Sequence, residues 1–126
     1  MPFESTRCAR LSGTTSALTT TSRQAVRVAD VRGPIPIEIR RIKVKRATGA
    51  ASVTFLPRIY SDSAGTSGTI SQEYSGTSTA STALFDATDV GAYCMTDANG
   101  YVYLQINPDV GGTDTWDYRI DVIIYR

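Results

Sequence analysis

Carboxylates that could bind a cation lie close together near the end of the chain. The stretch "NPDVGGTDTWD" contains Asp109, Asp114 and Asp117, and clustered oxygen ligands of this kind suit Ca²⁺. Aligned as an EF-hand loop, the stretch has Gly112 at the sixth position, where the loop needs glycine, but Tyr118 at the twelfth, where it needs a bidentate glutamate. We therefore interpret the cluster as an acidic turn, and we expect no metal and no cofactor.

Catalytic side chains are scarce. The chain contains no histidine, which excludes Ser-His, Cys-His and His-metal arrangements. The stretch "GTSGT" lacks the lysine and the helix of a phosphate-binding loop. Cys8 and Cys94 lie far apart in different kinds of segment, so we interpret them as two reduced thiols rather than a disulfide. The sequence predicts that the protein is not an enzyme.

A basic run is the clearest local charge feature, formed by Arg40, Arg41, Lys43, Lys45 and Arg46. In a strand, Lys43 and Lys45 share the outer face. Such a stripe could contact phosphates, but protection of a sheet edge or contact with an acidic protein surface is favoured. The net charge of +1 gives no global attraction to nucleic acid or to a membrane, and no apolar run could span a bilayer. We expect a protein partner, with no membrane and no nucleic acid.

Aromatic side chains allow a different kind of binding. Tyr101, Tyr103 and Trp116 could stack on sugar rings, as in lectin-like sandwiches. Alternating tyrosines are also typical of a half-buried subunit interface, and Trp116 fits a core position better. A carbohydrate-binding module therefore stays an alternative.

The elements that must position these residues are β-strands. Apolar and polar residues alternate at period two, and clusters of Gly, Asp, Asn, Ser and Thr separate the runs. In the last strand, one set of side chains faces inward and another outward: Trp116, Tyr118, Ile120 and Val122 against Asp117, Arg119 and Asp121. The spacing predicts an all-β fold, an antiparallel two-sheet β-sandwich or jelly roll of about seven or eight strands. We expect residues 1–22 to form an extended Ser/Thr-rich arm and residues 23–126 to form the sandwich.

Four local patterns refine this fold. In "IPIEIRRIKVKR" the apolar period breaks at Arg40 and Arg41, which predicts a β-bulge. The stretch "AYCMTDANGYVYLQI" reads as a hairpin with a turn at residues 97–100, and Pro57 places its own strand at an edge or a bulge. The stretch "DATDVG" could form one helical turn capped by Asp86.

Two features indicate assembly. The arm contains isolated apolar anchors, Phe3, Leu11 and Leu18, of the kind that order on a partner. At the other end, Ile123 and Tyr125 lie on the face that the preceding charged residues mark as outward. We predict that a neighbouring subunit or an N-terminal arm packs over these two side chains; coverage by the chain's own loops is the alternative.

The last quarter of the chain, "DANGYVYLQINPDVGGTDTWDYRIDVIIYR", resembles the small β-sandwich structural proteins of tailed bacteriophages. The resemblance lies in the aromatic strand, the Pro-Asp-x-Gly loop and the closing Trp-Asp-Tyr strand. It implies a virion protein made in the host cytoplasm, either a head decoration or cement protein or a tail, neck or baseplate component. It transfers no site residue.

We expect a head decoration protein that forms a homo-oligomer, a trimer, and binds the major capsid protein. From the residues above, the expected partner-binding set is Phe3, Leu11, Leu18, Arg40, Arg41, Lys43, Lys45, Ile123 and Tyr125.

Overall fold

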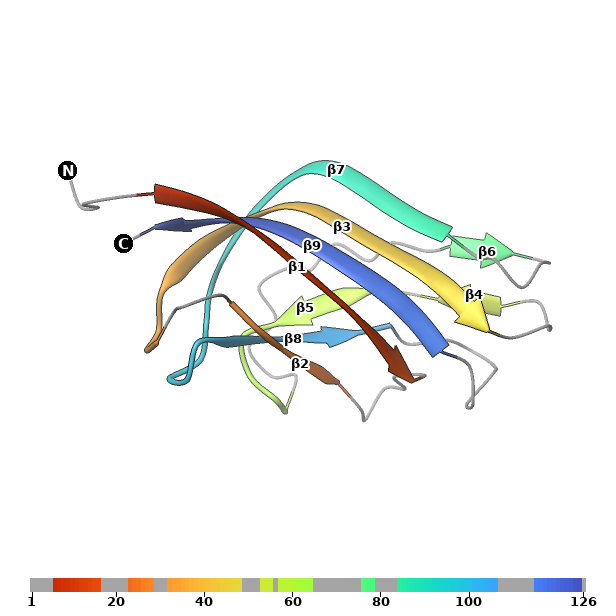
Figure 1. The fold of residues 1–126 in the computed structure, drawn as a ribbon, viewed down its shortest axis with the longest axis horizontal. Helices are drawn as coiled ribbons and strands as arrows, with labels where there is room; N and C mark the ends of the chain where they lie inside the picture. Colours follow the sequence, from red (N-terminus) through yellow and green to blue (C-terminus); the bar gives the residue numbers. More distant parts are fainter. Residues whose placement is uncertain are drawn as a thin grey trace.

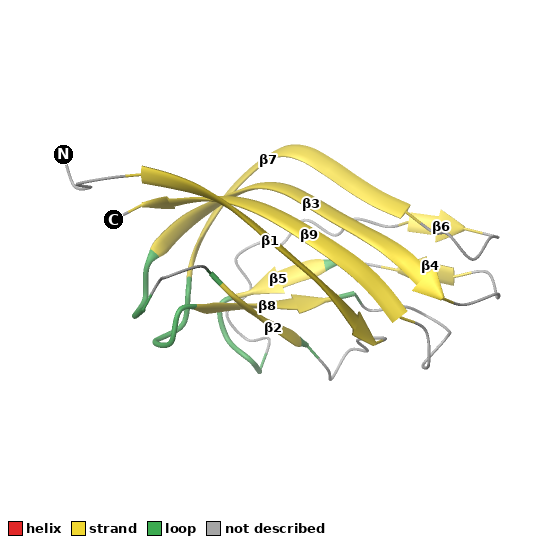
Figure 2. Ribbon diagram, viewed as in Figure 1, coloured by secondary structure: helices red, strands yellow, loops and turns green. Residues whose placement is uncertain are grey.

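The chain folds as two antiparallel sheets packed face to face (Figures 1 and 2). The computed structural model describes residues 6–16, 23–28, 32–48, 53–55, 57–64, 76–78, 84–106 and 115–125. Over these residues the regular elements are nine strands. The all-β sandwich predicted from the alternating pattern is therefore confirmed. No helix in the described part of the chain is long and apolar enough to cross a membrane.

The larger sheet has four strands in the order β1-β9-β3-β7. Their bounds are Thr6–Ser16 for β1, Thr115–Tyr125 for β9, Pro36–Thr48 for β3 and Leu84–Met95 for β7. The smaller sheet has the order β2-β8-β5, with bounds Gln24–Arg27, Tyr101–Gln105 and Arg58–Tyr60. A separate pair, β4 (Val53–Phe55) and β6 (Gly76–Ser78), lies beyond the ends of β3 and β7 (Figure 1).

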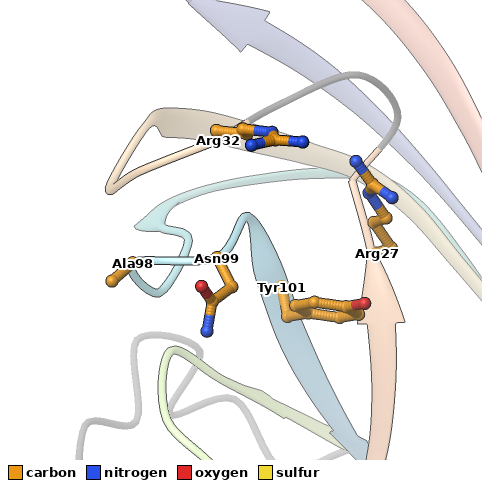
Figure 3. Close-up of a pocket in the computed structure, with 5 residues that line it drawn as sticks. All are labelled: Arg27, Arg32, Ala98, Asn99 and Tyr101. Carbon is orange, nitrogen blue, oxygen red and sulfur yellow. The ribbon is translucent and has the colours of Figure 1, made fainter.

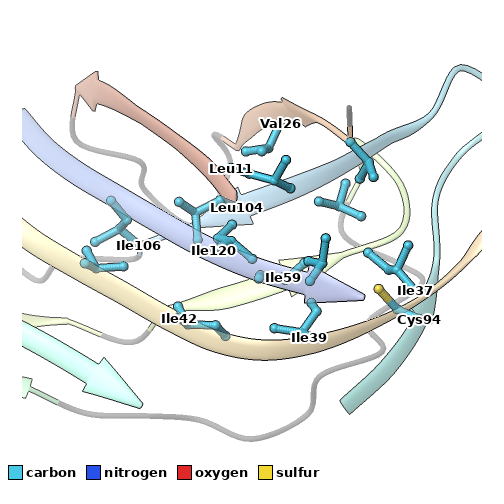
Figure 4. Close-up of a cluster of buried hydrophobic side chains, with 14 of the residues drawn as sticks. Leu11, Val26, Ile37, Ile39, Ile42, Ile59, Cys94, Leu104, Ile106 and Ile120 are labelled. Atoms are coloured by element: carbon cyan, nitrogen blue, oxygen red, sulfur yellow. The ribbon is translucent and has the colours of Figure 1, made fainter. Parts of the chain in front are cut away.

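The core lies between the two sheets and consists of the inward members of each alternating strand (Figure 4). Trp116, Ile120 and Val122 of β9 are buried there, as the sequence pattern predicts. Val102, Leu104 and Ile106 face them from the smaller sheet and are fully buried. Because each such aliphatic side chain contributes about 1.5–3 kcal/mol on burial, this face-to-face packing is the main stabilising contact.

The predicted bulge in β3 is confirmed. The register of β3 shifts between Ile39 and Arg41 against both neighbouring strands. Ile39 and Ile42 are consequently both buried, while Arg40 is exposed. The extra residue restores the inward period, because a slip of one position would otherwise turn the second half of the strand outward.

The predicted hairpin is wrong, although its turn is present. The strands on either side, β7 and β8, pair with different partners and belong to different sheets. Residues 97–100 form a turn in which the Gly100 N–H donates to the Asp97 carbonyl at 3.1 Å, and Gly100 has φ of 83°. The turn therefore connects the two layers of the sandwich.

Part of the predicted arm is an integral strand. β1 pairs with β9 from Thr6 opposite Tyr125 to Ser16 opposite Thr115. Leu11 is only 6% exposed and lies in the core, so β9 of the same chain orders this segment. The Ser/Thr-rich composition of this segment is compatible with a strand, because threonine is common in strands. Ala9 and Leu11, two positions apart, both point toward the core. Phe3 and Leu18 lie outside the described residues.

Two further local expectations change. The stretch "DATDVG" lies within β7, where pairing with β3 replaces the predicted helical turn. Pro57 falls between β4 and β5 instead of within one strand, and β5 is an edge strand as the proline suggested.

Cys8 is exposed and Cys94 is buried, and no disulfide joins them, as predicted. The acidic stretch at residues 107–114 lies outside the described part of the chain.

Candidate partner-binding surface

The outward face of the four-stranded sheet carries most of the predicted site residues. It divides into two regions along the strands. The aromatic end comprises Tyr93, Met95, Ile123 and Tyr125, and the charged region comprises Arg10, Arg41, Lys43, Lys45, Asp86, Asp117, Arg119 and Asp121. The side chains of the aromatic end come from β7 and β9, and those of the charged region come from all four strands.

The sheet register assembles the aromatic end from distant parts of the sequence. Ile123 of β9 is opposite Cys8 on one side and Glu38 on the other. Glu38 is in turn opposite Tyr93 of β7. Because side chains directly opposite in an antiparallel pair lie about 4.5–5.5 Å apart at Cβ, these four residues form one row across the sheet.

Two large side chains of the aromatic end are exposed to solvent. Tyr93 is 64% exposed and Met95 is 42% exposed, and these are the large exposed hydrophobic side chains of the described residues. Ile123 and Tyr125 beside them are half-buried. Contiguous apolar surface of this kind typically marks a protein contact.

A buried carboxylate organises the tyrosines of this end. Glu38 is 6% exposed, and its Oε1 accepts a hydrogen bond from the Tyr125 hydroxyl at 2.8 Å. Its Oε2 accepts one from the Arg40 guanidinium at 3.0 Å. The ring of Tyr125 lies at a tilt of 32° to that of Tyr93, with 6.2 Å between centroids. These contacts fix the Tyr125 ring against the sheet.

The titration of this pair follows from the same contacts. The hydrogen bond from Tyr125 lowers the pKa of Glu38, and the bond and charge of Arg40 act in the same direction against the effect of burial. The bond to Glu38 raises the pKa of Tyr125 to about 12. Near neutral pH the pair is therefore a carboxylate that accepts from a neutral phenol.

The charged region satisfies most of its own charges. Arg41 binds Asp86 through two hydrogen bonds of 2.9 and 2.6 Å. Asp121 accepts from Arg10 at 3.3 Å and from Arg119 at 3.2 Å. The predicted basic stripe is therefore interleaved with carboxylates of neighbouring strands, and Arg40 and Arg41 are engaged within the chain. Arg46, the last member of the predicted run, is buried and does not belong to the outer face.

Lys43 and Lys45 remain on the outer face, as predicted. Together with Asp117, Tyr118 and Arg119 they line a small hollow of about 210 Å³. Lys45 is exposed and lies opposite Asp117, and Lys43 lies opposite Arg119. Their ammonium groups are the cations of the stripe that face outward beside this hollow.

The structure brings six of the nine predicted partner-binding residues onto one face: Arg40, Arg41, Lys43, Lys45, Ile123 and Tyr125. Arg40 and Arg41 share it but bind neighbouring carboxylates, and Leu11 belongs to the core. Sequence reasoning missed Tyr93 and Met95. Their alternation with buried Cys94 was visible, but the assumed hairpin paired this segment with β8 instead of β3.

The tyrosines proposed for sugar stacking lie on the other sheet. Tyr101 and Tyr103 are half-buried on the outward face of β8, opposite to Val102 and Leu104, as predicted. The Tyr103 hydroxyl donates to the Asp97 carboxylate, which raises the pKa of Tyr103 to about 12. Tyr103 is therefore held by the turn, and Tyr101 lines an open hollow beside it.

No protein-family model matches the sequence, and no curated protein matches it. Among solved structures, the chain is similar to one in the structure titled "Cyanophage Pam1 capsid asymmetric unit". The two are 17% identical with a TM-score of 0.45, and the match covers 99% of this chain and 87% of that chain. A similarity at this identity and TM-score does not establish a function.

Proposed function

We propose that this chain is a non-enzymatic structural protein of a virion, a head decoration or cement protein that binds the major capsid protein. The observation that carries the proposal is the aromatic end, where Tyr93 and Met95 are exposed beside half-buried Ile123 and Tyr125. The resemblance of the C-terminal sequence to small β-sandwich structural proteins of tailed bacteriophages supports a role in a virion. The sequence further suggests synthesis in the host cytoplasm and assembly as a trimer.

The physical basis is the free energy available from covering this end. Burying the Tyr93 and Met95 side chains against a neighbour would contribute on the order of 3 kcal/mol. The charged region alongside would then form the polar rim that sets orientation and specificity. Lys43 and Lys45 are the rim cations that we assign to this role.

The non-enzymatic part of the proposal has separate support. Histidine is absent from the chain. Among the described residues, no group of three or more Cys, Asp or Glu side chains could hold a metal ion. Glu38 and Tyr125, whose pKa values are shifted, are bonded to each other on a sheet face, and Asp97 and Tyr103, which are shifted as well, are bonded to each other within the turn.

Cosedimentation tests the proposal. Purified protein is mixed with assembled capsids, and separately with tails, of the virus that encodes it, both prepared without this chain. We expect binding to capsids, at least tenfold weaker for the Tyr93→Ser/Met95→Ser double variant and unchanged for the control Ala25→Ser/Ala64→Ser, at two exposed positions outside this face. Sedimentation equilibrium of the free protein checks the trimer.

Three outcomes contradict the proposal in different ways. Binding to tails alone would favour a tail, neck or baseplate component. Binding to neither particle would reject a virion role. Equal loss in the double variant and the control would mean that the aromatic end is not the contact.

A further inference from the structure

A second surface lies at one end of the sandwich. It differs from the aromatic end in its side-chain chemistry and in the strands that form it. It is a hollow of about 520 Å³ lined by Arg27, Arg32, Ala98, Asn99 and Tyr101 (Figure 3). Arg27 and Tyr101 are opposite each other on β2 and β8, Arg32 precedes β3, and Ala98 and Asn99 belong to the turn before β8. Its volume lies within the range typical of small-molecule sites.

Backbone hydrogen bonds hold the walls of the hollow together. The Val28 N–H donates to the Gly100 carbonyl at 2.9 Å, which fixes the end of β2 to the turn. The Gly33 N–H donates to the Ala98 carbonyl at 3.0 Å. The Thr96 hydroxyl donates to the Gly33 carbonyl at 2.7 Å and accepts from the Ile35 N–H at 3.0 Å. The lining segments are therefore positioned before any ligand arrives.

The Asp97 carboxylate fixes the residues that form the floor. Its Oδ1 accepts from the N–H groups of Asn99 at 2.8 Å and Tyr101 at 2.9 Å, and its Oδ2 accepts from the Tyr103 hydroxyl. Burial raises the pKa of Asp97, but these hydrogen bonds outweigh it, so the pKa lies below its ordinary value. The carboxylate is thus used within the turn and does not pair with the arginines above it.

The two arginines are available to a ligand. Arg27 and Arg32 are exposed, and neither forms a hydrogen bond or an ion pair with any residue in the described ranges. Figure 3 shows both guanidinium groups on one side of the hollow, with the Tyr101 ring and the Asn99 amide on the other. Guanidinium groups bind carboxylates through paired hydrogen bonds, and a tyrosine face suits the C–H face of a sugar.

We propose that this hollow binds a sugar residue that bears a carboxylate, a uronic-acid unit of a polysaccharide. Arg27 and Arg32 would bind the carboxylate, Tyr101 would stack on the ring and the Asn99 amide would bond to ring hydroxyls. A lone phosphate or an acidic side chain would use the arginines but leave the aromatic wall and much of the volume unused. This inference does not depend on the proposed virion role.

Titration of the full chain with trigalacturonate tests the proposal, with the amide NMR signals of Asn99 and Gly100 as the readout. The methyl ester of the same trisaccharide and inorganic phosphate are the comparison ligands. We expect trigalacturonate to bind at least tenfold more tightly than its ester and than phosphate. Arg32→Gln and Tyr101→Leu should each weaken binding several-fold, whereas Arg10→Gln, a matched change on the other sheet, should not.

The fold of each variant is checked by its unfolding midpoint, and Arg32→Gln, on an exposed segment, keeps the test valid if Tyr101→Leu is unstable. Equal binding of acid and ester would remove the arginines from the site. Binding of phosphate or of an oligoglutamate as tight as that of trigalacturonate would overturn the sugar assignment. Absence of binding would overturn the proposal entirely.

Discussion

The charged region and the aromatic end of the same sheet face differ in how far their side chains are paired or covered within the chain. In the charged region, Arg41 binds Asp86, and Asp121 binds both Arg10 and Arg119. In the aromatic end, Glu38 holds Tyr125 in place, yet Tyr93 next to it is 64% exposed. Most charges of the charged region are paired within the chain, whereas the exposed side chains of the aromatic end gain further stabilisation only when a neighbour covers them.

This difference has a physical origin in the surrounding water. Exposed ion pairs contribute about 0–1 kcal/mol because water already solvates the charges, so the charged region gains little from a partner. Exposed aromatic and thioether side chains gain roughly 25 cal/mol for each Å² removed from water. A partner therefore gains affinity at the aromatic end and orientation at the charged region.

The largest expected effect comes from the middle of the aromatic end. Ile123→Ser should weaken capsid binding roughly tenfold, since a partner can bury only the exposed part of this half-buried side chain, which contributes about 1–1.5 kcal/mol. Cosedimentation at several protein concentrations measures this, with Ser12→Ala in the same sheet as the control. A loss of monomer stability larger than the loss of affinity would show that the chain itself covers Ile123.

A change at Gly13 of β1 tests how closely this strand packs against β9. A Cβ atom at Gly13 would lie 2.6 Å from the Tyr118 hydroxyl oxygen and 2.9 Å from its Cζ. Gly13→Ala should therefore displace the Tyr118 ring and lower the free energy of unfolding by about 1–2 kcal/mol, as overpacking does. Urea denaturation measures it. An unchanged midpoint would mean that the Tyr118 ring moves aside without cost.

The pH dependence of the aromatic end provides a third comparison. The pKa of Glu38 lies below its ordinary value of 4.5, so its stabilising contribution is present above pH 4.5 and is lost as the pH falls through the folded-state pKa. Tyr125→Phe removes the largest cause and should raise the pKa of Glu38, which flattens this part of the stability profile. NMR titration of the Glu38 carboxyl measures the shift, and no shift would contradict the hydrogen bond.

The smallest effect is expected in the charged region. Lys43→Glu/Lys45→Glu should weaken particle binding a few-fold and alter its salt dependence, because rim charges affect association more than stability. The unfolding midpoint should hardly change. Binding assays at two salt concentrations measure both the loss of affinity and its salt dependence. An effect as large as that of Ile123→Ser would remove the contrast between the two regions.

Sequence reasoning succeeded where the pattern was local. The alternation in β9 and the broken period at Arg40 predict the buried set and the bulge, because side-chain direction in a strand depends on neighbouring positions only. It failed where the outcome depended on pairing. Residues 84–95 could form a helical turn and a hairpin by their own sequence, but β3 provides the partner that makes them a strand of the larger sheet.

The sequence by itself therefore determined that the protein is a β-sandwich, which side chains of β9 point inward, and that histidine chemistry is excluded. Only the tertiary structure decided that residues 6–16 form an edge strand, that Tyr93 and Met95 lie with Ile123 and Tyr125, and that the basic stripe pairs with acids. The physical reason is that period-two alternation fixes the face of a residue, whereas its neighbours across the sheet depend on register between strands distant in sequence.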